Sequence, residues 1–126
     1  MAALLAGCSV DSFIWGTDGA KVIEATEKLI ADMAAGGTSN LVCADSTADF
    51  GKPSDWSSLS AGEPEQFSGK YWKDQAEFNP KWNINLEGLP AGATAGTTYP
   101  GDVFFRETDG ELCVIDVAWA TLSAAG

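Results

Sequence analysis

Two apolar stretches near the C-terminus are separated by an Asp-Gly pair, and this feature limits the fold most. Residues 102–107 read DVFFRE, residues 111–119 read ELCVIDVAW, and Thr108-Asp109-Gly110 lies between them. Asp-Gly favours the tight turn of a two-stranded antiparallel hairpin, because both positions require a positive φ. The pattern therefore predicts a hairpin whose second strand turns one face to the core: Cys113, Ile115, Val117 and Trp119.

A third strand is predicted upstream by alternation. Trp82, Ile84 and Leu86 alternate with polar residues, as in a strand that is buried on one face. A weaker pattern predicts another strand over residues 65–73. Residues 41–44, which precede these strands in the sequence, suggest a helical turn. Two apolar side chains in the Ser- and Gly-rich loop that follows are expected to anchor it to the core: Trp56 and Leu59.

Residues 19–35 have the period of an amphipathic helix. Asp18 is a suitable N-cap because its carboxylate can accept hydrogen bonds from the free amides of the first turn. Gly36-Gly37 is a suitable end, since glycine adopts the left-handed conformation that closes many helices. The predicted apolar stripe recurs every three or four residues: Val22, Ile23, Thr26, Leu29, Ile30 and Met33.

One helix followed by three or four antiparallel strands predicts an α+β fold. A sheet with one apolar face must be covered, and the amphipathic helix is the element available to cover it. The chain has 126 residues, which is the size of one domain. We expect that domain to span residues 18–126, with the helix packed on a curved antiparallel sheet.

The composition excludes several classes of function. The net charge is −11 and there is no histidine. A strongly acidic surface repels phosphate backbones, so nucleic-acid binding is not expected. Three cysteines without histidine do not form a standard zinc site, so neither a metal nor a cofactor is predicted.

The N-terminal residues Leu4-Leu5-Ala6-Gly7-Cys8 resemble the lipobox of bacterial lipoproteins. The resemblance implies that Cys8 carries lipid, that residues 1–7 are the remnant of a signal peptide, and that residues 8–17 are a tether. A complete signal has a basic start and a longer apolar run, so we expect further residues upstream of Met1. The expected location is extracytoplasmic, anchored to the membrane of the cell envelope through Cys8. The alternative is an accidental apolar terminus on a cytoplasmic protein.

If Cys8 carries lipid, Cys43 and Cys113 remain as a pair. A disulfide between them would join the region after the helix to the last strand. Disulfides persist outside the cytoplasm, so this pairing and the lipobox point to the same compartment. Two buried free thiols are the alternative.

No catalytic constellation is visible, and we predict that the chain is not an enzyme. Asp116 is the one acid surrounded by apolar residues on a predicted strand. The alternative function is therefore a small enzyme, or a small-molecule pocket, that uses Asp116.

Aromatic residues are more numerous than a small core requires. Tyr71-Trp72 and Phe104-Phe105 are adjacent pairs, so in a strand one member of each pair points away from the core. We list as a candidate binding surface Tyr71, Trp72, Trp82, Phe104, Phe105 and Trp119.

The order of helix, Gly-Gly exit, Cys-bearing segment and apolar hairpin resembles the cystatin/NTF2-like superfamily. Enzymes of that superfamily often use an Asp and a His, and this chain has no His. The resemblance implies a curved sheet wrapped on the helix. The leading hypothesis is a non-catalytic binding or interaction domain of the cell envelope, whose partner is an envelope protein or a small apolar ligand.

Overall fold

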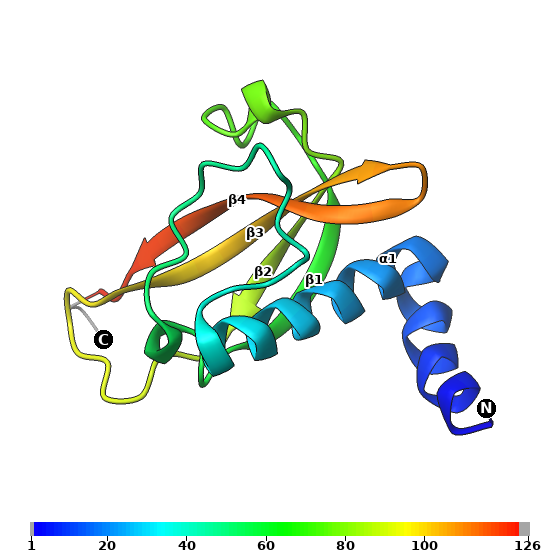
Figure 1. The fold of residues 1–126 in the computed structure, drawn as a ribbon, viewed down its shortest axis with the longest axis horizontal. Helices are drawn as coiled ribbons and strands as arrows, with labels where there is room; N and C mark the ends of the chain where they lie inside the picture. The colour runs from blue at the N-terminus through cyan, green and yellow to red at the C-terminus, as the bar shows by residue number, and fades with distance from the viewer. Residues whose placement is uncertain (1, 124–126) are drawn as a thin grey trace.

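The computed structural model describes residues 2–123, with side chains from residue 16 onward. One long helix is followed by four strands: α1 (Ala2–Gly36), β1 (Ser60–Gln66), β2 (Trp82–Glu87), β3 (Thr98–Thr108) and β4 (Glu111–Thr121). The strands form one antiparallel sheet in the order β1-β2-β3-β4. Helix α1 covers one face of this sheet (Figure 1). The predicted α+β class is confirmed.

Helix α1 is broken at Gly16, whose φ of 78° and ψ of 170° are not helical. The part before Gly16 turns away from the sheet, and the part after it packs on the sheet (Figure 1). Asp18 is therefore inside the second part, and the expectation that it caps the helix was wrong. The expected tether of residues 8–17 has helical backbone on both sides of the break. The Cys8 side chain lies outside the described residues.

The packed part of α1 buries the stripe that the sequence predicts. Val22 and Leu29 are fully buried and Met33 is 1% exposed. Thr26 is also fully buried, and its hydroxyl donates to the Val22 carbonyl at 2.7 Å, which satisfies a polar group in the core. Gly37, with a φ of 75°, ends the helix by donating its amide to the Met33 carbonyl at 2.9 Å.

The predicted hairpin is confirmed, and a β-bulge changes which residues face the helix. Asp109 and Gly110 form its turn with φ of 54° and 80°. Opposite the adjacent pair Phe104 and Phe105, β4 supplies an extra residue, Ile115. Val114 and Val117 consequently pack with the helix, whereas Cys113 and Ile115 pack on the opposite face. The expectation of one core face for Cys113, Ile115, Val117 and Trp119 was therefore wrong.

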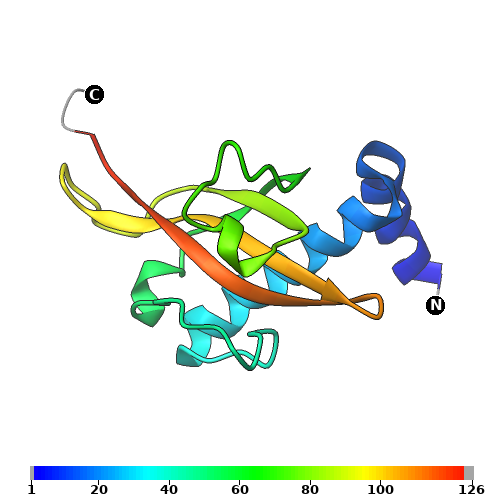
Figure 2. The same ribbon diagram turned by 90° about the horizontal axis from the view of Figure 1, so that it is seen from above.

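Residues 67–81 do not continue a strand as expected, because β1 ends at Gln66. They form a loop that contains the 3₁₀ turn η2 (Ala76–Phe78). This outer segment lies over the sheet on the side opposite α1 (Figure 2). Three of its aromatic residues pack against buried Phe104 and Ile115: Phe67, Trp72 and Phe78. Both faces of the sheet are therefore covered.

Residues 38–51, called here the edge strap, run beside the outer edge of β4. The expected helical turn at residues 41–44 is absent. Instead Val42 forms a parallel bridge with Val114. The Cys43 amide donates to the Val114 carbonyl at 2.9 Å, and the Val114 amide donates to the Leu41 carbonyl at 2.8 Å. The strap thus pairs backbone groups of β4 that an edge strand would otherwise expose.

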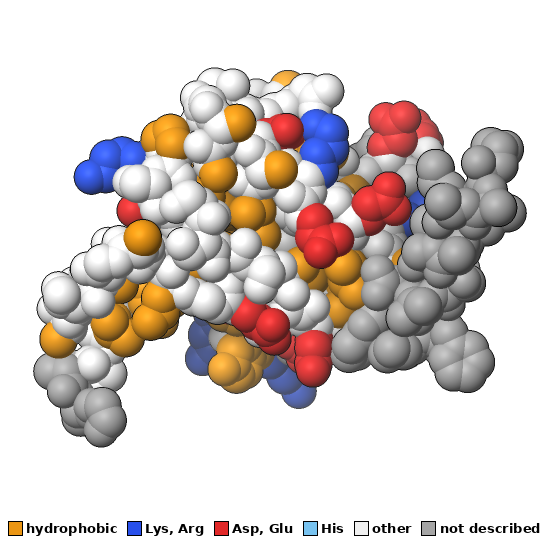
Figure 3. Space-filling model, turned by 90° about the horizontal axis from the view of Figure 1, so that it is seen from below, with side chains coloured by type: hydrophobic (Ala, Val, Ile, Leu, Met, Phe, Trp, Pro, Cys, Tyr) orange, Lys and Arg blue, Asp and Glu red, His pale blue; other side chains and the backbone are white. Residues whose placement is uncertain are grey.

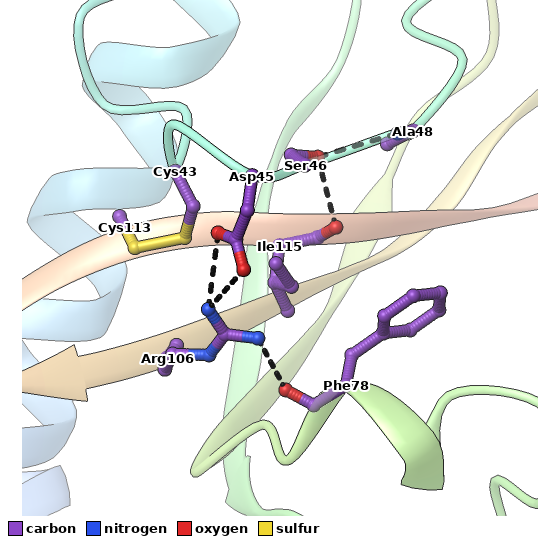
Figure 4. Close-up of polar contacts among 8 residues, drawn as sticks. All are labelled: Cys43, Asp45, Ser46, Ala48, Phe78, Arg106, Cys113 and Ile115. Atoms are coloured by element: carbon purple, nitrogen blue, oxygen red, sulfur yellow. Dashed lines mark hydrogen bonds and ion pairs between the residues drawn. A yellow bond between two sulfur atoms is a disulfide. The ribbon is translucent and has the colours of Figure 1, made fainter.

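A disulfide between Cys43 and Cys113 fastens the edge strap to β4, as the sequence predicts (Figure 4). Arg106 of β3 adds polar links. Its guanidinium donates to the Asp45 carboxylate at 3.0 Å and to the Phe78 carbonyl at 2.8 Å (Figure 4). One side chain therefore joins the strap and the outer segment.

The loop after the strap is anchored as expected. Trp56 is fully buried, Leu59 is 8% exposed, and the Trp56 indole donates to the Phe50 carbonyl at 2.7 Å. A short 3₁₀ turn, η1 (Pro53–Asp55), precedes Trp56.

Seen from the α1 side, acidic side chains are dispersed among apolar and uncharged atoms (Figure 3). Among the residues that the structure describes, no helix has both the length and the apolar character needed to cross a bilayer.

Candidate functional site

Strand alternation places four polar side chains together on the sheet face opposite α1. Asn83 of β2 pairs with Glu65 of β1, and Asn85 of β2 pairs with Asp102 of β3. The residues between them, such as Ile84 and Val103, point to the helix side and are fully buried there. A row of two amides therefore lies between two carboxylates.

Asn83 and Asp102 form the floor of this site. Asn83 is 2% exposed. Its side chain hydrogen-bonds to the Asp102 carboxylate, which is half-buried. A buried amide is costly unless its hydrogen bonds are made, so this contact fixes Asn83 in place.

Asn85 is held by a β-bulge in β1. The bulge lies between Ala61 and Pro64, and there the Glu63 amide donates to Asn85 Oδ1 at 2.8 Å. Gly62 lies directly against the Asn85 side chain, where a Cβ atom would clash. The irregularity of β1 thus makes room for Asn85 and orients it. Bulges often re-aim side chains in this way beside functional sites.

The outer segment supplies an aromatic wall. The Trp72 ring packs edge to face on Phe104 with centroids 4.9 Å apart, and Tyr71 packs on Trp72 at 5.2 Å. The Trp72 amide also donates to the Ser68 carbonyl at 3.0 Å. Trp72 is therefore fixed to the core below it, whereas Tyr71 is 78% exposed at the rim.

Floor and wall enclose a pocket of about 450 Å³. This volume is within the range of small-molecule sites. Its lining consists of two carboxylates, three amides, one hydroxyl and two aromatic rings: Glu65, Asp102, Gln66, Asn83, Asn85, Ser68, Tyr71 and Trp72. We call this set the outer pocket.

The electrostatics of the outer pocket are dominated by Asp102. Burial raises the pKa of its carboxyl to about 6; the hydrogen bond from Asn83 opposes this rise, and the charge of Glu65 adds to it. A neighbouring negative charge disfavours the ionised form of a carboxyl group. Asp102 therefore changes charge near neutral pH.

The outer pocket has no basic residue to balance its acids. Over residues 16–123, the ion pairs use cations and acids located elsewhere: Lys28 with Asp32, Lys81 with Glu107, and Arg106 with Asp45. In the same part of the chain, no three Asp, Glu or Cys side chains are grouped as metal ligands would be. The pocket consequently offers uncompensated negative charge beside aromatic rings.

The structure brings together only some of the aromatic residues listed from the sequence. Tyr71 and Trp72 line the outer pocket, and Phe104 supports it from below. Trp82 and Phe105 are buried on the α1 side. The inference that one member of Phe104-Phe105 is outward was wrong, because both faces of the sheet are covered and both rings are fully buried. Trp119 lies elsewhere, its indole donating to the Asp49 carbonyl at 2.9 Å.

Asp116 does not line the outer pocket. It lies at the β4 bulge and accepts a hydrogen bond from Gln75 of the outer segment at 3.2 Å. Sequence reasoning chose Asp116 because of its apolar neighbours and missed the residues that form the floor. Asn83 and Asn85 were assigned to a solvent-facing side of their strand. The signal that could have found them is Asp102, which directly precedes the apolar residues Val103, Phe104 and Phe105.

Two other hollows are present among the described residues. One lies between α1 and the hairpin tip, with a volume of about 610 Å³, and is lined in part by Lys21, Leu41 and Leu112. The other lies beside Trp119 and Lys52, with a volume of about 500 Å³. Both are more open than the outer pocket, and neither has a buried polar floor.

Comparison with known proteins found no matching family model, no similar curated protein and no similar solved structure. The chemistry of the outer pocket is therefore the basis for assigning a function.

Proposed function

We propose that this chain is a small-molecule-binding domain of the bacterial cell envelope, with its ligand in the outer pocket. The observation that carries the proposal is the combination of a buried polar floor, Asn83 and Asp102, with the fixed aromatic wall of Trp72. Binding sites for small molecules combine apolar walls with a few oriented polar groups in this way. The polar floor favours a polar ligand over the small apolar ligand expected from the sequence.

The helix on a four-stranded antiparallel meander supports a cystatin/NTF2-like fold. That likeness is one of layout and assigns no function by itself. The outer pocket lies on the sheet face opposite α1, so its function does not depend on the likeness.

The proposed location rests on two features. Leu4-Leu5-Ala6-Gly7-Cys8 resembles a lipobox, and the disulfide between Cys43 and Cys113 is of the kind that persists outside the cytoplasm. We place the domain on the outer side of the cytoplasmic membrane or beyond it, anchored by lipid on Cys8.

An NMR screen of the full chain tests the binding function. ¹⁵N-labelled protein is mixed with small polar compounds grouped as amines, sugars, carboxylates and nucleosides. We expect at least one group to shift the backbone amides of Asn83, Asn85 and Asp102, and to shift them less in Trp72→Ala. If no group shifts these amides, or if the shifts are confined to the groove between α1 and the hairpin, the proposal is wrong.

A second candidate is acid–base catalysis at the same place. Two carboxylates, Glu65 and Asp102, share the outer pocket, and the pKa of one is raised to about 6. Many enzymes keep a protonated carboxyl beside an ionised one. This replaces Asp116 as the acid of the enzyme alternative. Turnover of chromogenic glycosides or esters with a pH profile that Asp102→Asn abolishes would favour catalysis, and complete inactivity would leave binding as the function.

A further inference from the structure

The unbalanced charge of the outer pocket indicates what kind of ligand it takes. Asp102 is half-buried, Glu65 stands at the rim, and no Lys or Arg lines the pocket. Elsewhere among residues 16–123, three acids have basic partners: Asp32, Asp45 and Glu107. A desolvated carboxylate without an oppositely charged partner is unfavourable, and a bound cation would reduce that cost.

The aromatic wall adds a second, independent preference. Trp72 and Tyr71 lie beside the carboxylates, and an organic cation is attracted to the face of such rings as well as to the acids. Trp72 is held on Phe104 at a centroid distance of 4.9 Å, so the wall is in place before a ligand arrives. A hard metal ion prefers oxygen ligands and keeps its waters, so it gains less from the rings than an ammonium or guanidinium group does.

We propose that the ligand of the outer pocket is a small organic cation, whose ammonium or guanidinium group binds between Asp102 and Glu65 and beside the rings of Trp72 and Tyr71. This inference rests on the proposed binding function and names its ligand class. The amides of Asn83, Asn85 and Gln66 are then available to hydrogen-bond to the uncharged part of the ligand.

Binding of a cation is linked to the protonation of Asp102. The titratable groups that line the pocket are Glu65 from β1, Asp102 from β3 and Tyr71 from the outer segment, and β2 contributes only neutral amides. A cation prefers the ionised form of Asp102, so affinity rises as the pH rises through about 6. At pH 5 the Asp102 carboxyl is ionised in about one molecule in ten. Cation binding should therefore be about tenfold weaker at pH 5 than at pH 7.5.

Isothermal titration calorimetry of the full chain tests this with matched probes. Cadaverine is compared with 1,5-pentanediol, and glucosamine with glucose, at pH 7.5 and pH 5. The two compounds of each pair differ only in that one has amino groups where the other has hydroxyl groups. We expect the amine of at least one pair to bind at least about tenfold more tightly than its neutral partner at pH 7.5, as for a desolvated charged contact.

Three variants test whether the preference for amines depends on the carboxylates of the outer pocket. Asp102→Asn is expected to weaken amine binding at pH 7.5 about tenfold or more and to remove most of its pH dependence. Glu65→Gln is expected to weaken binding and move the pH midpoint downward, because it removes a neighbouring negative charge. Asp116→Asn makes the same change as Asp102→Asn, on the same face of the sheet but outside the outer pocket, and should leave both quantities unchanged.

Each outcome decides between the two proposals. If a neutral partner binds as tightly as its amine, the cation inference is wrong and the binding function stands. If no amine binds but another compound class shifts the amides of the outer pocket by NMR, the cation inference is again wrong. If no compound of any class shifts those amides, the binding function fails as well. Amine binding that Asp102→Asn leaves intact would also overturn the inference.

Discussion

Asp102 shows how a single side chain links stability to function. It lies on β3 beside the buried floor residue Asn83 of β2, with the rim residue Glu65 beyond Asn83 on β1, in a place where water is partly excluded. Its ionised form is disfavoured by burial and by a like charge, and no basic side chain offsets this. Residues that weaken the folded protein in this way are often retained where a ligand supplies the missing partner.

Asp102→Asn should stabilise the protein at neutral pH. The folded-state pKa of Asp102 is raised above its unfolded value, so its favourable contribution is complete below pH 4 and is lost as the pH rises through about 6. Relative to wild type, Asp102→Asn should therefore gain roughly 1–2 kcal/mol between pH 4 and pH 7, after a discount for partial exposure. Urea unfolding at four pH values measures this difference.

The matched control is Asp116→Asn, which makes the same change on the same face of the sheet but outside the outer pocket. A constant difference for Asp102→Asn across pH 4 to pH 7 would contradict the description of the site.

Prediction from sequence succeeded for some residues of the site and failed for others for a physical reason. Tyr71 and Trp72 were listed because adjacent aromatic residues cannot both enter one core. Asn83 was missed because alternation cannot distinguish a face open to solvent from one that a loop covers. The outer segment that buries Asn83 has no periodic pattern, and its position depends on contacts with Phe104 from a distant part of the chain.

At the scale of elements, a β-bulge accounts for the wrong assignment of the faces of β4. The bulge at Ile115 places Val114 on the helix side together with Val117, and the bulge after Ala61 orients Asn85. A bulge shifts the alternation by one residue, so a regular pattern assigns faces wrongly beyond it. The helix stripe and the Asp-Gly turn depend on local sequence alone, and both were predicted correctly.

The edge strap depends on its disulfide. Cys43 and Cys113 are 70 residues apart in sequence, and closing a loop of that length stabilises a protein by roughly 4 kcal/mol. Cys43→Ala/Cys113→Ala should lose an amount of that order in urea unfolding, and hydrogen exchange at the Val114 amide should accelerate most. Cys8→Ser is the control in unlipidated protein and should lose little. Equal stability of the double variant and wild type would contradict the role of the strap.

The hairpin turn allows a clean test of backbone conformation. Gly110 has a φ of 80° and has no atom near its missing side chain, so Gly110→Ala should cost about 1–2 kcal/mol through the left-handed conformation alone. Gly36→Ala is the matched control, since Gly36 ends α1 and is equally free of neighbours. That change should be neutral or slightly stabilising, because alanine favours the helix. Thermal unfolding that ranks the two variants in the opposite order would contradict the turn assignment.

At the scale of the whole molecule, the sheet separates two different environments. Its α1 side is an apolar core, and its other side combines an aromatic cluster with the outer pocket. The outer segment covers the side of the sheet opposite α1. The opening on that side is the outer pocket, where polar residues take the place of apolar ones. The helix therefore covers the apolar core, and the outer segment shapes the site.

The proposed export concerns the whole chain and can be tested through its thiols. If Cys8 carries lipid as proposed, protein purified from its source should have no free thiol under denaturing, non-reducing conditions, because Cys43 and Cys113 are paired. Its intact mass should show a lipid-modified Cys8 as the first residue. Unlipidated full-length protein is the control and should have one free thiol. Three free thiols in the source protein would contradict both the location and the disulfide.

The central claim is that the outer pocket is a binding site for an organic cation. A crystal structure of the full chain grown near pH 7.5 and soaked with cadaverine tests it most directly. We expect one ammonium group within hydrogen-bond distance of the Asp102 carboxylate, with the chain of the diamine beside Trp72. A diamine found only in the groove between α1 and the hairpin, or no bound diamine at all, would contradict the claim.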